Sequence, residues 1–355
     1  MLPVIYYPNQ EFKMAARRIH KQVIEPKPPK TRQYVKVGLM FNDMKDKLRL
    51  DLVNDNRSFD RKIEQKELNR PGLALGGFVE VFTYWRVQVM GNTEIGFLNT
   101  LHGKERVDAI TNVLSFELPC IIVTNNNKIP DELIKIADEK GVTIFSTPDN
   151  TTNIHRLLGE YLDEKFAPRL VVHATLVDVF SVGVLFTGAA SIGKSEVALD
   201  LIERGHQLVA DDAVEITKFG THTLQGAPVG TLGHHMEIRG LGIIDVYKMF
   251  GVRGIRGRKD IHVIVKLEKF GGEENYERTG LDETYTQIMG IDIPLVELPV
   301  MEGKNLTIVA EAIALDQKLK QIGIFQALEF NENLMRKNMT NSLKVPDKEI
   351  DTEDI

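Results

Sequence analysis

Apolar and polar positions repeat with two different patterns in the first half of the chain, short apolar runs and the helical period. Together these patterns predict short strands alternating with helices. Residues 86–90 and 120–124 are strand-like, and the second run is entirely apolar apart from its end, as in a buried parallel strand. Residues 105–114 and 131–140 repeat their apolar positions with the helical period. From about residue 37 to 168, we therefore expect a small α/β domain.

The second half of the chain also alternates predicted strands with predicted helices, and glycines mark the boundaries of these elements more clearly. Residues 182–187 form an apolar strand run, and an apolar stripe over residues 197–202 predicts a helix after it. Residues 206–210 predict a second short strand. Near the C-terminus, residues 311–339 have a helical pattern that we expect to break at Gly323.

Length and composition indicate how many domains these predicted elements form. The chain has 355 residues, of which 43% are apolar and 26% charged. These values are ordinary for a globular protein of two domains, and they exclude a fibrous, collagen-like or largely disordered chain. The plan is a basic, Pro-interrupted arm and linker (1–36), an α/β domain (37–168), a second α/β domain carrying the chemistry (169–342) and an acidic tail (343–355).

Charge, apolar runs and cysteine content limit the compartments and the classes of partner that we expect. No apolar run approaches 18 residues and the first residues lack the order of a signal peptide, so we expect a soluble cytoplasmic protein without a membrane partner. The single cysteine, Cys120, excludes an internal disulfide and a cysteine-based zinc site. The net charge of −6 argues against nucleic acid as the main partner, although the basic arm could act as a nucleic-acid tail.

A glycine-rich loop follows the strand of residues 182–187. The chain reads Gly188, four residues, then Gly193-Lys194-Ser195, which is the P-loop pattern between a strand and a helix. Glycines let consecutive backbone N–H groups curl around phosphate oxygens, and the helix start adds the positive end of its dipole. Lys194 would reach the β- and γ-phosphates, and the Ser195 hydroxyl would sit on Mg²⁺. The predicted nucleotide-binding residues are Gly188, Ala189, Ala190, Ser191, Ile192, Gly193, Lys194 and Ser195.

Two acidic residues, Asp211 and Asp212, end the strand of residues 206–210. In an α/β sheet, the carboxyl end of a neighbouring strand opens into the same crevice as the P-loop. These carboxylates are therefore candidates for holding the metal or for accepting a proton from an attacking hydroxyl, with a solvated acidic turn as the alternative.

Further ionisable residues crowd between glycines in residues 230–246, a pattern typical of functional loops. The cluster of His234, His235 and Glu237 lacks the i, i+4 histidine pair of a helical zinc site, so Mg²⁺ binding through Glu237 is the more economical hypothesis. His173 precedes the strand that leads to the P-loop, and a lone histidine there is structural by default.

Together these segments resemble the HPr kinase/phosphorylase family, bacterial enzymes that phosphorylate and dephosphorylate a serine of the phosphocarrier protein HPr. The resemblance rests on His173 ahead of residues 176–179, on the P-loop through Lys194-Ser195-Glu196, on residues 208–214 and on residues 236–245. It extends to residues 69–73 and 91–94 of the first domain and covers roughly residues 37–340.

The resemblance implies an α/β fold, with an N-terminal domain similar to one in the Mur ligases and a C-terminal P-loop kinase domain related to phosphoenolpyruvate carboxykinase. It also implies ATP and Mg²⁺ as cofactors, HPr as protein partner and a homohexamer.

By position, His173 and Lys194 match catalytic residues and Asp212 matches the residue that takes the seryl proton. Ser195 and Glu237 match the Mg²⁺ ligands, and Arg278 matches another active-site residue. In the reverse reaction, inorganic phosphate would attack phosphoserine to give pyrophosphate.

Two departures from the family pattern bear on activity. Ala189-Ala190-Ser191 stands where the family usually has a polar residue followed by Ser-Gly, so the loop lacks one glycine, although nucleotide binding is expected to survive. Met301 and Lys304 stand where the family usually has two arginines, in a segment tied to dephosphorylation. Because this removes planar bidentate phosphate recognition, we expect a weaker phosphorylase than is typical of the family.

Two other hypotheses are compatible with the P-loop. One is a kinase for a small molecule, and the other is a nucleotide-gated regulator that binds ATP without transferring phosphate. A regulator would not need a base beside the γ-phosphate.

Overall fold

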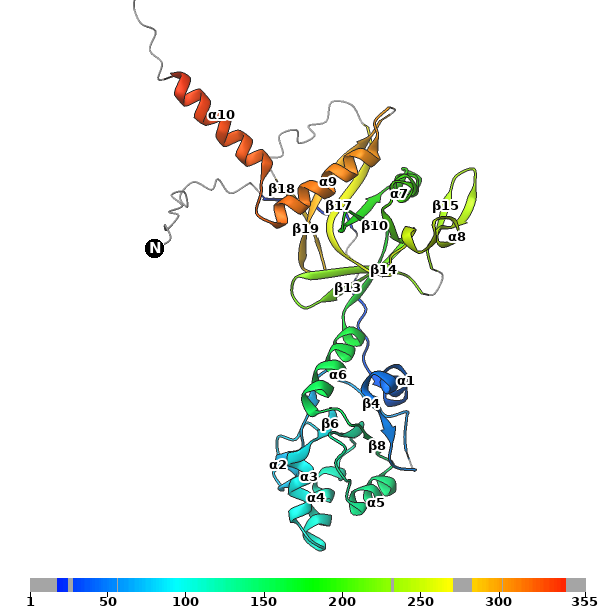
Figure 1. Ribbon diagram of the computed structural model, residues 1–355, viewed down its shortest axis with the longest axis vertical. Coiled ribbons are helices and arrows are strands. Elements are labelled where there is room, and N and C mark those ends of the chain that lie inside the picture. Colours follow the sequence, from blue (N-terminus) through cyan, green and yellow to red (C-terminus); the bar gives the residue numbers. More distant parts are fainter. Residues whose placement is uncertain are drawn as a thin grey trace, which may run out of the picture. The chain divides into compact units, whose positions relative to one another are not determined.

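The computed structural model describes residues 18–24, 28–55, 57–230, 233–270, 283–301 and 303–342 (Figure 1). The chain divides into two compact units. The N-terminal unit consists of the described residues from Lys30 to Pro168, and the C-terminal unit combines those from Arg169 onward with those before Lys30. Within the described ranges, no helix has the length and apolar character needed to span a membrane.

A five-stranded sheet forms the centre of the N-terminal unit. Its order is β3 (Asp51–Leu52), β8 (Thr143–Ser146), β7 (Cys120–Val123), β6 (Val87–Met90) and β5 (Leu68–Asn69). Only β3 at the edge is antiparallel to its neighbour. The strands β6 and β7 are buried along their whole length, as central parallel strands covered on both faces should be. The two strands predicted in this half of the chain are thus confirmed.

Helices cover both faces of this sheet. The helices α1 (Val37–Leu48) and α6 (Thr151–Phe166) share one core with it. On the other face, a second core includes side chains of α2 (Gly72–Leu75), α3 (Asn92–Thr100), α4 (Lys104–Leu114) and α5 (Asp131–Lys140). The short strands β2 (Val35–Lys36) and β4 (Lys62–Ile63) pair beside α1. Cys120 is fully buried in the first core, and burial raises the pKa of its thiol to about 12.

The C-terminal unit is built on a larger mixed sheet. Its main path runs β1 (Arg18–His20), β18 (Glu283–Ile288), β19 (Ile291–Val300), β17 (Lys259–Lys269), β11 (Val182–Gly188), β10 (Thr175–Val179) and β12 (Gln207–Ala210). The strands β19, β17 and β11 are parallel, whereas β10 is antiparallel to both β11 and β12. An antiparallel group of β9 (Arg169–His173), β13 (Ala213–Phe219) and β14 (Thr223–Pro228) joins this sheet through β17.

The two faces of this sheet bury different partners. On one face, α7 (Lys194–Glu203) and α9 (Leu306–Gln321) pack against alternate residues of β10, β11 and β17 (Figure 1). On the other face, the remaining alternate residues pack with side chains of β9, β13 and β14. The helix α10 (Gln326–Ser342) follows α9 after Gly323, whose φ of 84° lies in the left-handed region. The helix break predicted at Gly323 is confirmed.

Residues 230–246, expected as a loop, are more regular than predicted. They contain the hairpin of β15 (His235–Ile238) and β16 (Gly242–Asp245), which leads into α8 (Val246–Phe250) and a 3₁₀ turn (Gly251–Gly254). The hairpin is anchored because Met236 and Ile244 are buried in the core that contains α7. Of the glycines that suggested a loop, Gly240 lies in the turn of this hairpin, Gly242 begins β16, and Gly230 and Gly233 precede β15.

Part of the expected N-terminal arm belongs to the sheet. The strand β1 pairs in parallel with β18, and Lys21 donates its backbone N–H to the Tyr285 carbonyl at 2.8 Å. Val23 and Ile24 pack against the core beneath β9 and β13. These apolar residues lie within a basic stretch, which explains why composition alone indicated a solvated arm.

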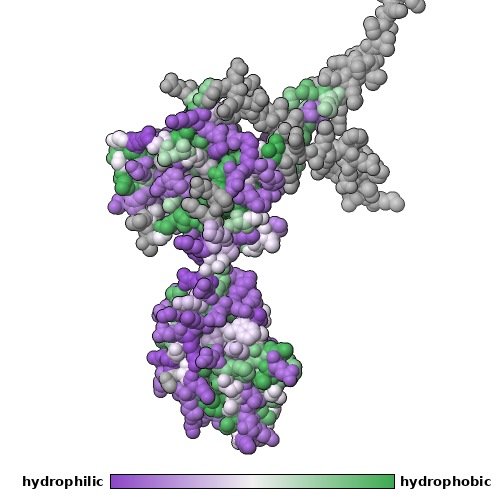
Figure 2. Space-filling model, turned by 180° about the vertical axis from the view of Figure 1, so that it is seen from behind, coloured by the Kyte–Doolittle hydropathy of each residue, from purple (hydrophilic) through white to green (hydrophobic). Residues whose placement is uncertain are grey.

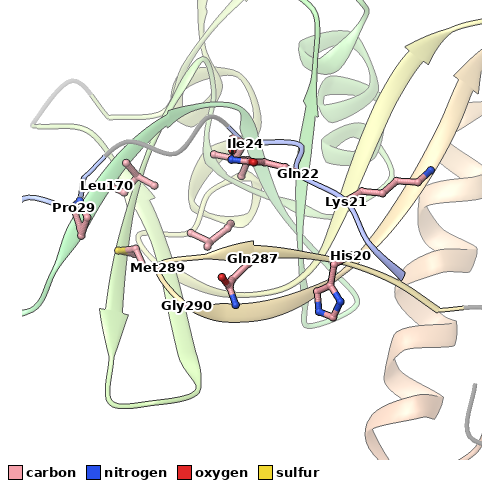
Figure 3. Close-up of a pocket in the computed structure, with 10 residues that line it drawn as sticks. His20, Lys21, Gln22, Ile24, Pro29, Leu170, Gln287, Met289 and Gly290 are labelled. Carbon is pink, nitrogen blue, oxygen red and sulfur yellow. Dashed lines mark hydrogen bonds between the residues drawn. The ribbon is translucent and has the colours of Figure 1, made fainter. Parts of the chain in front are cut away.

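A cavity of about 610 Å³ lies between this segment and the turn from β18 to β19 (Figure 3). Apolar side chains such as Ile24, Leu170 and Met289 line one part of it. His20 lies at its rim, where its Nε2 is 3.2 Å from the Asp292 carboxylate. None of the residues predicted to be catalytic lines this cavity.

The surface of both units mixes hydrophilic and hydrophobic side chains on the face that Figure 2 shows. Exposed apolar side chains on the C-terminal unit include Leu241, Ile243 and Tyr247, on and beside the β15–β16 hairpin. The hairpin therefore buries one side against α7 and leaves apolar side chains of its turn and of α8 in contact with solvent.

The strand β11 depends on Gly183, where the chain approaches β17 too closely for a side chain. A Cβ placed on Gly183 would lie 2.0 Å from the backbone oxygen of Asp260. We expect Gly183→Ala to lower the free energy of unfolding of the C-terminal unit by about 2 kcal/mol, because the strands must separate locally. Chemical denaturation, followed separately for the two units, measures this change in the free energy of unfolding.

The matched control for Gly183→Ala is Gly257→Ala in the same unit. A Cβ placed on Gly257 would have no atom within 4 Å, and the backbone there has no positive φ, so stability should hardly change. Equal effects of the two substitutions would contradict the close approach of β11 and β17.

Candidate functional site

The P-loop lies at the carboxyl end of β11 and leads directly into α7. Three of its residues have positive φ: Gly188 at 139°, Ser191 at 67° and Gly193 at 110°. A Cβ on Gly188 would lie 2.5 Å from the Leu267 carbonyl oxygen, so this first glycine is required by packing as well as by conformation. Ser191 occupies a left-handed position that favours glycine, at a cost of about 1 kcal/mol.

Lys194, the first residue of α7, is buried with 6% of its surface exposed. Its ammonium donates hydrogen bonds to the carbonyl oxygens of Gly188 at 3.3 Å and Ala189 at 3.1 Å. The charge is therefore held over the loop that the sequence predicts for phosphates. Such a position lets one cation face both the loop and an anion bound in it.

Ser195, the next residue, contacts the carboxylate of Asp211, which directly follows β12. Its hydroxyl donates to Asp211 at 2.9 Å and 3.1 Å for the two carboxylate oxygens. The Thr175 hydroxyl donates to Asp211 as well, at 2.6 Å. Burial raises the pKa of Asp211, while the two hydroxyl donors act in the opposite direction. Three oxygen-bearing side chains thus meet at the edge of the sheet.

Asp212 makes a different contact from Asp211. It has a φ of 66°, and its side chain is 77% exposed. One carboxylate oxygen lies 2.9 Å from Nδ1 of His173, the last residue of β9. The pairing follows from the ladder of β9 and β13, which sets His173 opposite Ala213, and from the Ala174 N–H donating to the Asp212 carbonyl at 3.3 Å. A carboxylate next to an imidazole is therefore exposed to solvent.

The other predicted site residues have different surroundings. Glu237 lies on β15 with an exposed side chain, and no contact links it to Ser195 or Asp211 within the described residues. Met301 is 38% exposed just after β19, and the Lys304 N–H donates to its carbonyl at 3.3 Å. Arg278 lies outside the described residues.

The sequence pattern did not single out Thr175, and it left open which member of the acidic pair faces the P-loop. Alternation in the strand could not decide this, because both carboxylates lie beyond Ala210, the last residue of β12, and Asp212 has a left-handed φ of 66°. Within the described ranges, no three His, Cys, Asp or Glu side chains gather closely enough to form a protein-only metal site. The oxygen-bearing side chains of the cluster are the hydroxyls of Thr175 and Ser195 and the carboxylate of Asp211, and bound phosphates would have to supply further metal ligands.

Comparison with known proteins gives a consistent result over both units. Two domain families match: one described as HPr Serine kinase N terminus over residues 35–162, the other as HPr Serine kinase C-terminal domain over residues 164–334. A protein of Chloroherpeton thalassium named HPr kinase/phosphorylase is 44% identical over 318 residues, covering 89% of this chain and 94% of its own. One of the same name from Chlorobaculum tepidum is 47% identical over 260 residues, covering 73% and 76%.

Among solved structures, the Hpr(Ser) kinase/phosphatase from Coxiella burnetii is 34% identical, with a TM-score of 0.40, covering 46% of this chain and 99% of that one. The family matches extend through the P-loop, the Asp211–Asp212 pair and the β15–β16 hairpin. With both domain families in order along the chain and relatives at this identity, the protein belongs to the HPr serine kinase family.

Proposed function

We propose that this protein transfers the γ-phosphoryl group of ATP to a serine of the phosphocarrier protein HPr, and that it also removes the phosphoryl group with inorganic phosphate. Family membership supports the activity and the protein substrate. The observation that carries the proposal is the exposed Asp212–His173 pair beside the P-loop, at 2.9 Å. Neither a nucleotide-gated regulator nor a plain nucleotide-binding domain needs such a base.

The P-loop and Lys194 supply the nucleotide site in this proposal. Backbone N–H groups of residues 188–193 would surround the phosphates, and the Lys194 ammonium would neutralise charge on the transferred group. Arg278 would add a second cation, as its place in the family motif implies. Phosphoryl transfer depends mainly on such positioning and electrostatics, because the chain itself forms no covalent bond to the group.

The hydroxyl of Ser195 and the carboxylate of Asp211 fit a hard cation such as Mg²⁺, because both offer oxygen and lie 2.9 Å apart. When bound, Mg²⁺ would neutralise the nucleotide phosphates. The structure supports Ser195 as a ligand and adds Asp211 beside it. Glu237 stays in the proposal through its place in the family motif.

Asp212 is proposed to accept the proton of the seryl hydroxyl as the serine oxygen attacks the γ-phosphorus and the bond to the β-phosphate oxygen breaks, releasing ADP. His173 orients the accepting carboxylate through Nδ1 and can share the proton. In reverse, inorganic phosphate attacks phosphoserine, pyrophosphate forms, and Asp212 returns the proton to the serine oxygen. One site serves both directions.

The assembly and compartment are proposals of the same kind. Family membership supports a homohexamer acting in the cytoplasm, with HPr as its macromolecular partner and neither membrane nor nucleic acid involved.

Incubating the full chain with labelled ATP and HPr tests the proposed function directly. Labelled phosphoserine on HPr is expected; label transfer only to a small molecule, or ATP binding without transfer, would overturn it.

Lys194→Ala should abolish phosphotransfer in both directions while leaving the fold intact, because the cradle of backbone donors persists but its charge is lost. Kinase turnover and circular dichroism of the purified variant measure the two parts. Lys248→Ala is a matched control, because Lys248 is an exposed lysine of the same unit in a surface ion pair with Asp245. Near-normal turnover of folded Lys194→Ala would disprove the P-loop assignment.

Asp212→Asn and Asp211→Asn should separate the two carboxylates. Asp212→Asn loses the proton acceptor, so kcat should fall by about 10²-fold or more with little change in ATP affinity. Asp211→Asn should instead raise the Mg²⁺ concentration needed for half-maximal activity, because Ser195 loses its anionic neighbour. Titrating both variants with Mg²⁺ at saturating ATP provides the comparison. A mild effect of Asp212→Asn beside a severe loss of kcat in Asp211→Asn would reverse the two assignments.

The balance of the two reactions should depend on residues 301 and 304. Phosphorolysis brings two anions together, so it needs fixed cationic forks more than the kinase reaction does. We expect weak phosphorolysis in the native chain, and we expect Met301→Arg with Lys304→Arg to raise it more than it raises phosphorylation. Pyrophosphate release from serine-phosphorylated HPr at saturating phosphate is the measurement. Strong native phosphorolysis, unchanged in the double variant, would show that other cations serve this role.

A further inference from the structure

The hydroxyl of Thr175 has no role in the packing of its strand. Thr175 is the first residue of β10, a strand buried along its whole length, and its side chain has no exposed surface. Val177, on the same face of β10, packs in the core that contains α7. A valine at position 175 would keep the β-branched shape and the strand preference without a hydroxyl. The hydroxyl at this buried position is therefore explained by its hydrogen bond and not by packing.

That hydrogen bond goes to one particular oxygen of Asp211. The Thr175 hydroxyl donates to Oδ1 at 2.6 Å, a shorter distance than either contact of this carboxylate with Ser195. The Ser195 hydroxyl lies 3.1 Å from the same Oδ1 and 2.9 Å from Oδ2. Because Thr175 already occupies Oδ1, the single hydrogen of the Ser195 hydroxyl is directed to Oδ2, the nearer oxygen. Thr175 thereby fixes which oxygen of the carboxylate accepts from Ser195.

A β-bulge brings Asp211 to the face of the sheet on which Thr175 lies. In the ladder of β10 and β12, Val209 has no partner, because the pairing passes from Leu208 directly to Ala210. Leu208 packs in the core of α7, whereas Val209 and Ala210 both pack in the core on the opposite face. In a regular strand, successive side chains alternate, and Asp211 would then point away from α7. The extra residue returns Asp211 to the α7 face, as bulges beside active sites commonly do.

The orientation of Asp211 determines where the oxygen of Ser195 is available. When the Ser195 hydroxyl donates its hydrogen to Asp211, its lone pairs point away from the carboxylate and can bind a cation. A carboxylate that is free to rotate would leave the Ser195 hydroxyl without a fixed acceptor. The hydroxyl could then donate to a phosphate oxygen, and its lone pairs would no longer face a cation. The contact with Thr175 restricts this rotation.

We propose that Thr175 is a positioning residue of the cation site, whose hydroxyl holds the Asp211 carboxylate in the orientation that leaves the Ser195 oxygen free for Mg²⁺. Thr175 acts through Asp211 and does not itself contact the cation. The inference rests on the proposed function for the nucleotide and for Mg²⁺, but not for HPr as the substrate.

The test is a calorimetric titration of the full chain with ATP at a series of Mg²⁺ concentrations, without HPr. Thr175→Val should raise the Mg²⁺ concentration that gives half of the Mg²⁺-dependent gain in ATP affinity by about 10-fold, because a hydrogen bond to a charged group is lost. ATP affinity without Mg²⁺ should not change, since the P-loop and Lys194 are intact. In a separate assay, kcat at saturating Mg²⁺ should stay within about 2-fold of the native value.

Two further variants separate the hydroxyl from packing. Thr175→Ser keeps the hydroxyl and loses one methyl group, so it should retain the native Mg²⁺ requirement. Thr286→Val is the matched control, because Thr286 lies on β18 of the same unit and is 1% exposed. Its hydroxyl has no hydrogen-bond partner in the part of the chain that the structure describes. Removing this second buried hydroxyl should leave the Mg²⁺ requirement unchanged.

A double-mutant cycle tests whether Thr175 acts through Asp211. Asp211→Ala alone should raise the Mg²⁺ requirement at least as much as Thr175→Val does. Adding Thr175→Val to Asp211→Ala should change the requirement by less than about 2-fold, because the group that Thr175 positions is already absent. A smaller effect of Asp211→Ala than of Thr175→Val, or additive effects of the two, would contradict this connection.

Other results would also overturn the positioning role. These are an equal loss in Thr175→Ser and Thr175→Val, equal effects of Thr175→Val and Thr286→Val, a lower kcat of Thr175→Val with an unchanged Mg²⁺ requirement, and ATP binding by the native chain that does not respond to Mg²⁺. The native chain could show the expected Mg²⁺ effects without phosphorylating HPr. That result would overturn the proposed substrate and support the role of Thr175, because the titration does not use HPr.

Discussion

The position of β11 between an antiparallel and a parallel neighbour determines the geometry of the candidate active site. Because β10 is antiparallel to β11, its first residue, Thr175, pairs with Phe186 near the end of β11. Because β12 is antiparallel to β10, its last residue, Ala210, pairs with Leu176. The start of one strand and the ends of two others therefore share one edge, and Thr175, Ser195 and Asp211 meet there. The close approach of β11 to β17 at Gly183 holds the same strand on its other side.

At that edge, two consecutive acidic residues have opposite environments. Asp211 is held among hydroxyl donors, and burial raises its pKa. Asp212, with its left-handed backbone, is mostly exposed and faces His173. Adjacent residues of a strand point to opposite faces, but these two residues lie beyond the end of β12, and the left-handed turn at Asp212 accompanies a contact of the second carboxylate with His173. A short acidic pair can in this way present two chemically different carboxylates at one candidate site.

The parts of the fold that follow from the local sequence pattern were predictable from the sequence. The parts that depend on which strands pair with one another were not. The P-loop needs a strand, a glycine pattern and a helix within about 20 residues, and all three are visible in the sequence. The contact between Ser195 and Asp211 depends on strand order, which no local pattern encodes. The insertion of β1 beside β18 joins segments more than 260 residues apart in sequence, and its few apolar residues lie among lysines and arginines. The roles expected of Arg278 and Glu237 rest on the family motif, since Arg278 lies outside the described residues and Glu237 makes no contact with the P-loop cluster among those described.

The burial of Cys120 has a practical consequence for labelling the two units at chosen positions. It is the single cysteine of the chain, and with a pKa of about 12 and no exposed surface it presents almost no thiolate near neutral pH. A cysteine introduced on the surface of either unit would therefore be the dominant reactive thiol without any prior removal of the native one. Fluorophores or spin labels attached at one such position in each unit would report the distance between the units throughout a catalytic cycle.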